Sequence, residues 1–180
     1  MEIENNDVNI LTFCNISGLS KEDQDMLIRV GEWITPAIPA LTGRFYEVLQ
    51  EDPQTAPYLD GRLDVLQKTH IAWMKELFAG DYGEDFIRRQ EKIGEAHVRV
   101  RVPPLFVAAS MSFLRAALPE VVSRNMQDTQ VAGKAIASLL RLMDLCQYLI
   151  DRAYNHSLMD NLGINPALLL RLQTIGSKTK

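Results

Sequence analysis

Residues 84–104 read EDFIRRQEKIGEAHVRVRVPP, and they carry the strongest structural signal in the chain. Apolar residues recur in this stretch at intervals of three and four, which predicts an amphipathic helix over about 84–102. His97 lies on the apolar stripe of that helix, so its imidazole is predicted to face the interior of the protein. Pro103 and Pro104 end the helix and begin the next one, because proline is well tolerated at a first helical position.

The same helical spacing continues through most of the chain, and the alternating patterns typical of β-strands are almost missing. The sequence therefore predicts an all-α fold. Ser20 and Asp23 have the pattern of a helix N-cap followed by its third-position acid. The first three predicted helices are a short N-terminal one, one that begins at Ser20, and one that has Pro36 and Pro39 near its start and ends near Glu51. A loop is predicted over 52–61. Four more helices are predicted over about 63–79, 84–102, 104–124 and 129–156.

Length, composition and charge argue against several classes of protein. The 180 residues fit one domain, and an apolar share of 47% with 23% charged residues is ordinary for a globular chain. A net charge of −4 offers no basic face to nucleic acid, and no apolar run is expected to reach the roughly 18 residues of a membrane span. Residues 1–7 contain no apolar signal-peptide core, and Cys14 and Cys146 form no paired motif, so we predict a cytoplasmic protein.

Two of the three histidines, His70 and His97, lie on the apolar stripes of consecutive predicted helices. Each of them alone fits a core histidine whose hydrogen bonds are satisfied. Together they can face each other across a slot between two helices, and a flat, apolar iron cofactor would fill such a slot and use a nitrogen from each side. Because the chain has no CxxCH motif, a haem in this slot would be bound non-covalently.

The residues around His97 suit a ligand of haem iron. Gly94 lies one turn earlier and would lower the helix surface so that a macrocycle could approach, and the carbonyl of Ile93 could accept the second ring N–H. Arg99 and Arg101 follow the histidine and could reach the haem propionates. The alternative for these two arginines is a solvated face with favourable charge at a helix C-terminus.

Tyr46 is the candidate on the opposite side of such a slot, in a helix patterned for burial and directly after Phe45. It could be an aromatic core residue whose hydroxyl finds a backbone acceptor, or it could donate a hydrogen bond to a ligand on the iron. In the second case Leu66 and His70 would complete the distal wall. His156 is predicted to be exposed and without a function.

Three stretches of the chain resemble the sensor globins, the family of globin-coupled sensor domains, protoglobins and their single-domain relatives. They are RFYEVLQEDP at 44–53, LQKTHIAWMKELFAG at 66–80 and KIGEAHVRVRVPP at 92–104. The last is the most specific, with its glycine three residues before the histidine and its prolines after it. With the helices between and after these motifs, the resemblance covers roughly residues 18–155.

This resemblance implies a role for each matching residue. His97 takes the place of the proximal haem ligand, and Tyr46 takes the place of the usual distal hydrogen-bond donor. His70 stands where some members carry a histidine that binds the iron when no gas is present, and Leu66 matches a position that lines the distal pocket. One departure is that Val100-Arg101 replaces the isoleucine-glycine usual in the family.

The resemblance also implies a fold, partners and an order of domains. We expect a globin fold with an extra N-terminal helical segment that dimerises through its last two long helices, where Phe106, Ala109, Phe113, Ala117 and Val121 are predicted to be buried. The expected division is an extension at 1–17, a sensor globin domain at 18–157, and a tail or linker at 158–180. An output domain such as a diguanylate cyclase, a histidine kinase or a chemotaxis transducer would lie outside these 180 residues.

The leading hypothesis is a haem b globin that binds O2, CO or NO, with O2 as the first candidate, as the sensor module of a signalling protein rather than as an enzyme. Two other hypotheses remain. One is a haem redox globin that consumes O2, NO or peroxide, and no acid–base pair of the peroxidase type supports it. The other is a haem-free helical interaction domain in which the buried histidines are structural.

Overall fold

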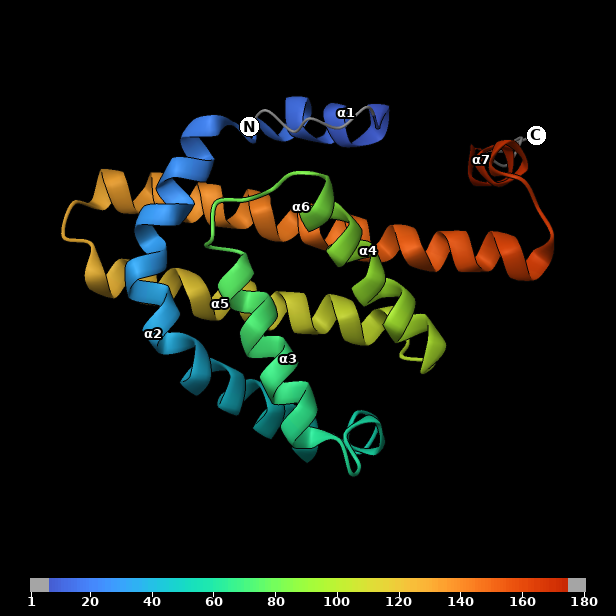
Figure 1. Ribbon diagram of the computed structural model, residues 1–180, viewed down its shortest axis with the longest axis horizontal. Helices are drawn as coiled ribbons and strands as arrows, with labels where there is room; N and C mark the ends of the chain where they lie inside the picture. Colours follow the sequence, from blue (N-terminus) through green and yellow to red (C-terminus); the bar gives the residue numbers. More distant parts are fainter. Residues whose placement is uncertain (1–6, 175–180) are drawn as a thin grey trace, which may run out of the picture.

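The computed structural model describes residues 7–174, and every regular element in that range is helical (Figure 1). The predicted extension and tail therefore lie partly outside the described residues. The elements are α1 (Val8–Ser17), α2 (Lys21–Glu51), a short 3₁₀ helix η1 (Ala56–Tyr58), α3 (Leu63–Glu76), α4 (Glu84–Arg99), α5 (Pro104–Asn125), α6 (Thr129–Leu162) and α7 (Pro166–Thr174). This confirms the all-α prediction.

Helix α2 begins as predicted and continues further than predicted. Ser20 and Asp23 form a capping box, in which the Ser20 amide donates to the Asp23 carboxylate at 2.8 Å. The expectation of a new helix near Pro36 is wrong, because Pro36 and Pro39 lie inside one continuous helix that changes direction about halfway along (Figure 1). A proline inside a helix removes one backbone hydrogen bond and bends the axis, and packing of α2 on α3, α5 and α6 holds the bent helix together.

Helix α6 is the centre of the core and packs against α2, α4 and α5. Its inward side carries fully buried aliphatic residues together with Cys146. The helix was predicted to end near residue 156, but it continues to Leu162 and stops at Gly163, which adopts the left-handed conformation with φ 63°. The end of α6 and the short α7 extend away from the other helices (Figure 1).

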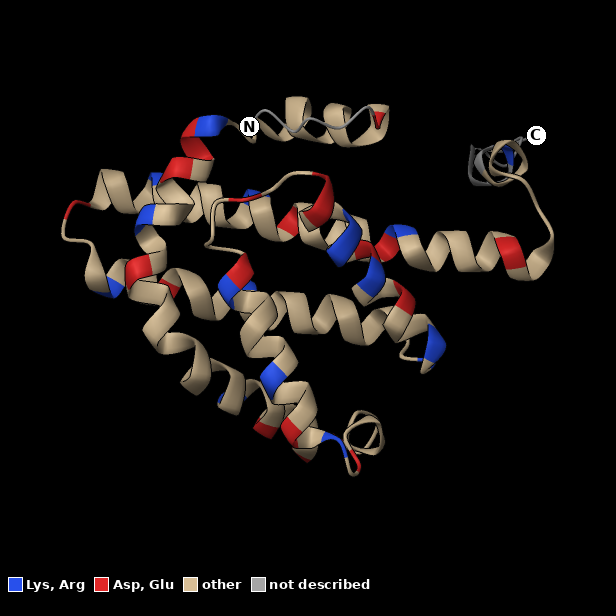
Figure 2. Ribbon diagram, in the orientation of Figure 1, with Lys and Arg blue, Asp and Glu red and all other residues tan. Residues whose placement is uncertain are grey.

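Helix α5 has the length and composition of a membrane span, with 22 residues and a mean hydropathy of 1.5 over its most apolar 18 residues. Figure 2 shows few charged residues along it. The expectation that no apolar run comes near membrane length was therefore wrong for this helix. In the fold, α5 packs on α2 and α6, and Leu114 and Leu118 on its inner face are almost completely buried. Ala109, which was predicted to be buried, is exposed on the opposite face.

Helices α3 and α4 are held by different neighbours, since α3 packs on α2 and α4 packs on α6. Two side-chain contacts join them. The Trp73 indole N–H donates to the Gln90 amide oxygen at 2.8 Å, and Arg89 forms an ion pair with Glu76 at 2.9 Å. Between the two helices, on the side of η1 and α5, the fold leaves a cavity.

Candidate functional site

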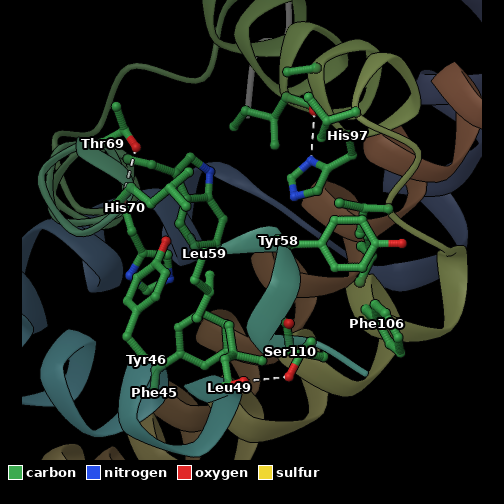
Figure 3. Close-up of a pocket in the computed structure, with 18 of the residues that line it drawn as sticks. Phe45, Tyr46, Leu49, Tyr58, Leu59, Thr69, His70, His97, Phe106 and Ser110 are labelled. Atoms are coloured by element: carbon green, nitrogen blue, oxygen red, sulfur yellow. Dashed lines mark hydrogen bonds between the residues drawn. The ribbon is translucent and has the colours of Figure 1, made fainter. Parts of the chain in front are cut away.

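The cavity has a volume of about 350 Å³ and lies between α2 and α3 on one side and α4 and α5 on the other (Figure 3). Its lining is mainly apolar, as expected for a site that binds a hydrophobic ligand. Of the predicted site residues, six line it: Phe45, Tyr46, Leu66, His70, Ile93 and His97. Apolar residues that sequence reasoning did not single out complete the walls, namely Leu49, Leu59, Val102, Val107, Met111, Leu114 and Ile150.

His97 enters the cavity from α4 with one nitrogen fixed and the other free. Its Nδ1 lies 2.7 Å from the Ile93 carbonyl oxygen, the contact that the spacing of the two residues predicts. Because a carbonyl can only accept, Nδ1 must carry the proton and donate it. Nε2 then keeps its lone pair and faces the cavity (Figure 3). A histidine held in this way has the tautomer and the orientation of a metal ligand.

Tyr46 lies across the cavity from His97, on α2. It is 6% exposed, and burial raises the pKa of its phenol to about 12, so the hydroxyl remains protonated near neutral pH. The hydrogen bonds found within residues 7–174 include none from this hydroxyl. Tyr46 is therefore a buried donor next to an apolar cavity, able to serve a polar group that enters it.

His70 lies beside Tyr46 and is held by contacts on several sides. Its ring stacks on Phe45 with centroids 5.0 Å apart, meets the Tyr46 ring edge-on at 5.8 Å, and lies 5.4 Å from the Trp73 ring. Its Nδ1 is 3.1 Å from the Thr42 hydroxyl. Burial lowers the pKa of His70 to about 4, so the imidazole is neutral near pH 7.

Gly94 does not line the cavity, and the predicted approach of a macrocycle to this residue is wrong for the structure. A Cβ added here would lie 2.5 Å from the Ile150 carbonyl oxygen and 2.7 Å from the Ala153 Cβ, so Gly94 faces α6. The missing side chain allows α4 to pack closely on α6. Gly94 and His97 are neighbours on the helix surface, about 60° apart, so Gly94 can contact α6 while His97 faces the cavity.

Arg101 and Arg99 are also outside the cavity, and both are exposed. Arg101 has a left-handed backbone with φ 59°, and its carbonyl accepts a hydrogen bond from the Tyr58 hydroxyl at 3.1 Å. Among the described residues that line the cavity, Arg62 alone carries a cationic side chain. It donates to the Tyr58 carbonyl at 2.9 Å. Sequence reasoning missed Arg62 because it closes a stretch that was interpreted only as a connecting loop.

A family model described as Protoglobin matches residues 9–160. The chain belongs to the protoglobin family. The globin domain of a globin-coupled sensor from Geobacter sulfurreducens has a similar structure, with a TM-score of 0.76 and 26% identity over 80% of this chain and 96% of that chain. Two structures of the globin domain of E. coli DosC, one ferrous and one ferric, match with TM-scores of 0.69 and 0.68 at 18% identity, over 79% of this protoglobin and 99% of the matched chains. The fold is therefore that of a sensor-type globin domain, as the sequence motifs indicated.

Membership of a globin family implies that this protoglobin binds haem, and the cavity fits that group. An apolar slot suits the porphyrin ring, the free Nε2 of His97 suits the iron, and the cationic Arg62 suits a propionate. His70 offers a second neutral imidazole on the opposite wall. The donor set is thus nitrogen on both sides of an apolar cavity, which is the chemistry of haem ligation rather than of a hard cation.

Proposed function

We propose that this protoglobin is a gas-sensing module that holds haem b non-covalently through His97 and binds a diatomic gas, with O2 as the leading candidate ahead of CO and NO. The proposal depends on two groups that face each other across one apolar cavity. One is the His97 Nε2, which has an available lone pair, and the other is the buried, protonated hydroxyl of Tyr46. Haem iron held by one imidazole offers its other axial position to a diatomic gas.

Each wall has a separate task in this proposal. On the proximal side, the Ile93 carbonyl fixes the tautomer and the orientation of His97. On the distal side, the Tyr46 hydroxyl donates to a polar ligand, which favours O2 over the less polar CO. Arg62 neutralises a propionate at the edge of the cavity, and the surrounding apolar side chains keep water away from the site.

A homodimer formed through α5 and α6, located in the cytoplasm and coupled to an output domain outside this chain, completes the proposal. Small residues lie exposed on α5, among them Ala108, Ala109, Ser112 and Ala116, and this face supports a close helix contact between two copies. Sedimentation of wild type and Ala109→Arg tests this part. We expect the wild type to be a dimer and the variant to shift to monomer. A wild type that stays monomeric at high concentration contradicts the dimer.

The haem site is tested by purifying the protein from cells supplied with haem and recording visible spectra in the ferric, ferrous and CO-bound forms. Wild type should show a Soret band, and resonance Raman of its five-coordinate ferrous form should show an iron–histidine stretch. In a His70→Ala background, which removes the second imidazole from the cavity, His97→Ala should lose that stretch, whereas His156→Ala should keep it, because His156 is exposed near the end of α6.

Three results would contradict the proposal. Wild type without a Soret band would indicate the haem-free interaction domain, and an iron–histidine stretch that persists in the His70→Ala/His97→Ala double variant would remove His97 from the site. Steady turnover of NO or peroxide well above that of free haem would favour the redox globin.

A further inference from the structure

Thr42 is a buried polar residue in the middle of α2, one turn before Tyr46, and no sequence motif pointed to it. Its side chain is 1% exposed. The hydroxyl oxygen lies 3.1 Å from His70 Nδ1 and 4.0 Å from the Met74 sulfur. A buried hydroxyl in a core helix requires such partners, and here the stronger of them is the ring that faces the cavity.

We propose that Thr42 is a positioning residue for His70, whose hydroxyl supports the tautomer with the proton on Nδ1, the one that leaves Nε2 able to bind the haem iron. The inference rests on the proposed function, since it concerns the haem in that same cavity. Thr42 itself touches neither haem nor gas.

The other neighbours of His70 cannot select a tautomer. Phe45 stacks on the ring and Trp73 packs against it at a tilt, and both contacts are nearly the same whichever nitrogen carries the proton. Within the described residues, Thr42 provides the hydrogen bond to a His70 ring nitrogen. A neutral imidazole has one N–H, which can be on either ring nitrogen.

A threonine hydroxyl can serve both tautomers because it donates and accepts. When it donates to Nδ1, the ring proton is on Nε2, and His70 turns an N–H toward the cavity. When it accepts from Nδ1–H, Nε2 keeps its lone pair and can bind iron, while the hydroxyl proton turns toward the Met74 sulfur, which is a weak acceptor at 4.0 Å. The two states differ in the position of one ring proton and have the same charge.

Ligation by His70 depends on Thr42 more strongly than the donor state does. If Nε2 binds iron, Nδ1 must carry the proton, and without the hydroxyl that N–H would be buried with no acceptor. Leaving a buried donor unpaired is costly, so loss of the hydroxyl should lower the equilibrium constant for His70 ligation by about tenfold or more.

The test compares Thr42→Val, which keeps the shape, with Thr42→Ser, which keeps the hydroxyl, in haem-loaded protein. We expect the six-coordinate low-spin fraction of the ferric and ferrous protein to fall in Thr42→Val, with an equilibrium constant about tenfold lower. Thr42→Ser should remain within about twofold of wild type, because its hydroxyl makes the same hydrogen bond. Thr42→Ala replaces Thr42→Val if the valine variant does not fold.

A second measurement reads the tautomer directly, by nitrogen-15 NMR of the histidine rings in the diamagnetic ferrous CO complex. The chain has three histidines, so His70→Ala assigns the signal. We expect the protonation pattern of His70 to change in Thr42→Val and to be unchanged in Thr42→Ser. A purely structural threonine would lower the melting temperature and leave this pattern as it is.

The proposal is overturned if Thr42→Val keeps both the wild-type spin state and the wild-type ring signals. This failure differs from failure of the proposed function, in which wild type shows no Soret band. The NMR comparison still decides the role of Thr42 if the resting iron is five-coordinate, because it does not depend on His70 ligation.

Discussion

The close approach of α4 to α6 predicts that one added methyl group at Gly94 destabilises the fold. In Gly94→Ala the new Cβ would lie 2.5 Å from the Ile150 carbonyl oxygen and 2.7 Å from the Ala153 Cβ. Neither neighbour is the end of a flexible side chain, so α4 must move outward by roughly 1 Å, and overpacking of this kind costs about 1–3 kcal/mol. Alanine gains about 0.5–1 kcal/mol over glycine in a helix. The free energy of unfolding should therefore fall, by about 1 kcal/mol at the middle of these ranges and by about 2.5 kcal/mol at most.

The matched control is Gly133→Ala in α6, where an added Cβ would meet nothing within 4 Å. This variant keeps only the gain in helix propensity, and its free energy of unfolding should rise by about 0.5–1 kcal/mol. Urea denaturation of the haem-free proteins, followed by circular dichroism, measures both changes. Haem dissociation from the loaded proteins is measured beside them, because Gly94 lies one turn from His97.

The reasoning is refuted if the haem-free Gly94→Ala protein is as stable as Gly133→Ala. If such a protein also lost haem much faster than wild type, Gly94 would face the macrocycle, which is the role that the sequence motif suggested. A loss of stability that is the same with and without haem supports helix packing instead.

Three further predictions concern the cavity. Tyr46→Phe removes the distal donor, so stopped-flow release of O2 should become about tenfold faster with little change for CO, and equal O2 rates would exclude Tyr46 as the donor. Arg62→Gln should speed haem transfer to an acceptor apoglobin several-fold, whereas Arg101→Gln should not; an effect of the second variant alone would assign the propionate to Arg101. Because burial lowers the pKa of His70 to about 4, the unfolded chain binds a proton more readily than the folded one between about pH 6.5 and pH 4. Stability from this residue is therefore present above pH 6.5 and is lost as the pH falls to 4, by up to about 3 kcal/mol, and haem-free His70→Gln should show a flatter stability curve over that range.

Most of the fold could be predicted because helical periodicity and capping are local properties. The capping box at Ser20 and the hydrogen bond from His97 to Ile93 depend on residues three or four positions apart, and both occur as predicted. The break expected near Pro36 is absent because packing of α2 on three other helices outweighs the local preference of proline. Tertiary contacts of this kind are not encoded in spacing along one helix.

Site residues that belong to a sequence motif could be predicted. Residues whose role depends on contacts with other elements of the fold were predicted less well. His97 and Tyr46 were found from their motifs, and they face one cavity. Gly94 was predicted to face the cavity because it lies one turn from His97. The spacing along α4 cannot show that α6 packs against the helix surface at Gly94. Arg62 and Thr42 were missed because their partners lie on other elements or across a loop, so no periodic pattern marks them.

The hydrogen bond between Trp73 and Gln90 explains how the two walls of the cavity keep a fixed relation. His70 is carried by α3, which packs on α2, and His97 by α4, which packs on α6. Trp73 lies one turn after His70, and its indole N–H can only donate, so the Gln90 amide must turn its oxygen toward it. The Gln90 Nε2 is then left buried without a hydrogen-bond partner among the described residues, at a cost of about 1–3 kcal/mol that an apolar side chain would avoid. The connection to Trp73 accounts for the polar residue at this position, because it joins α4, two turns before His97, to α3, one turn after His70.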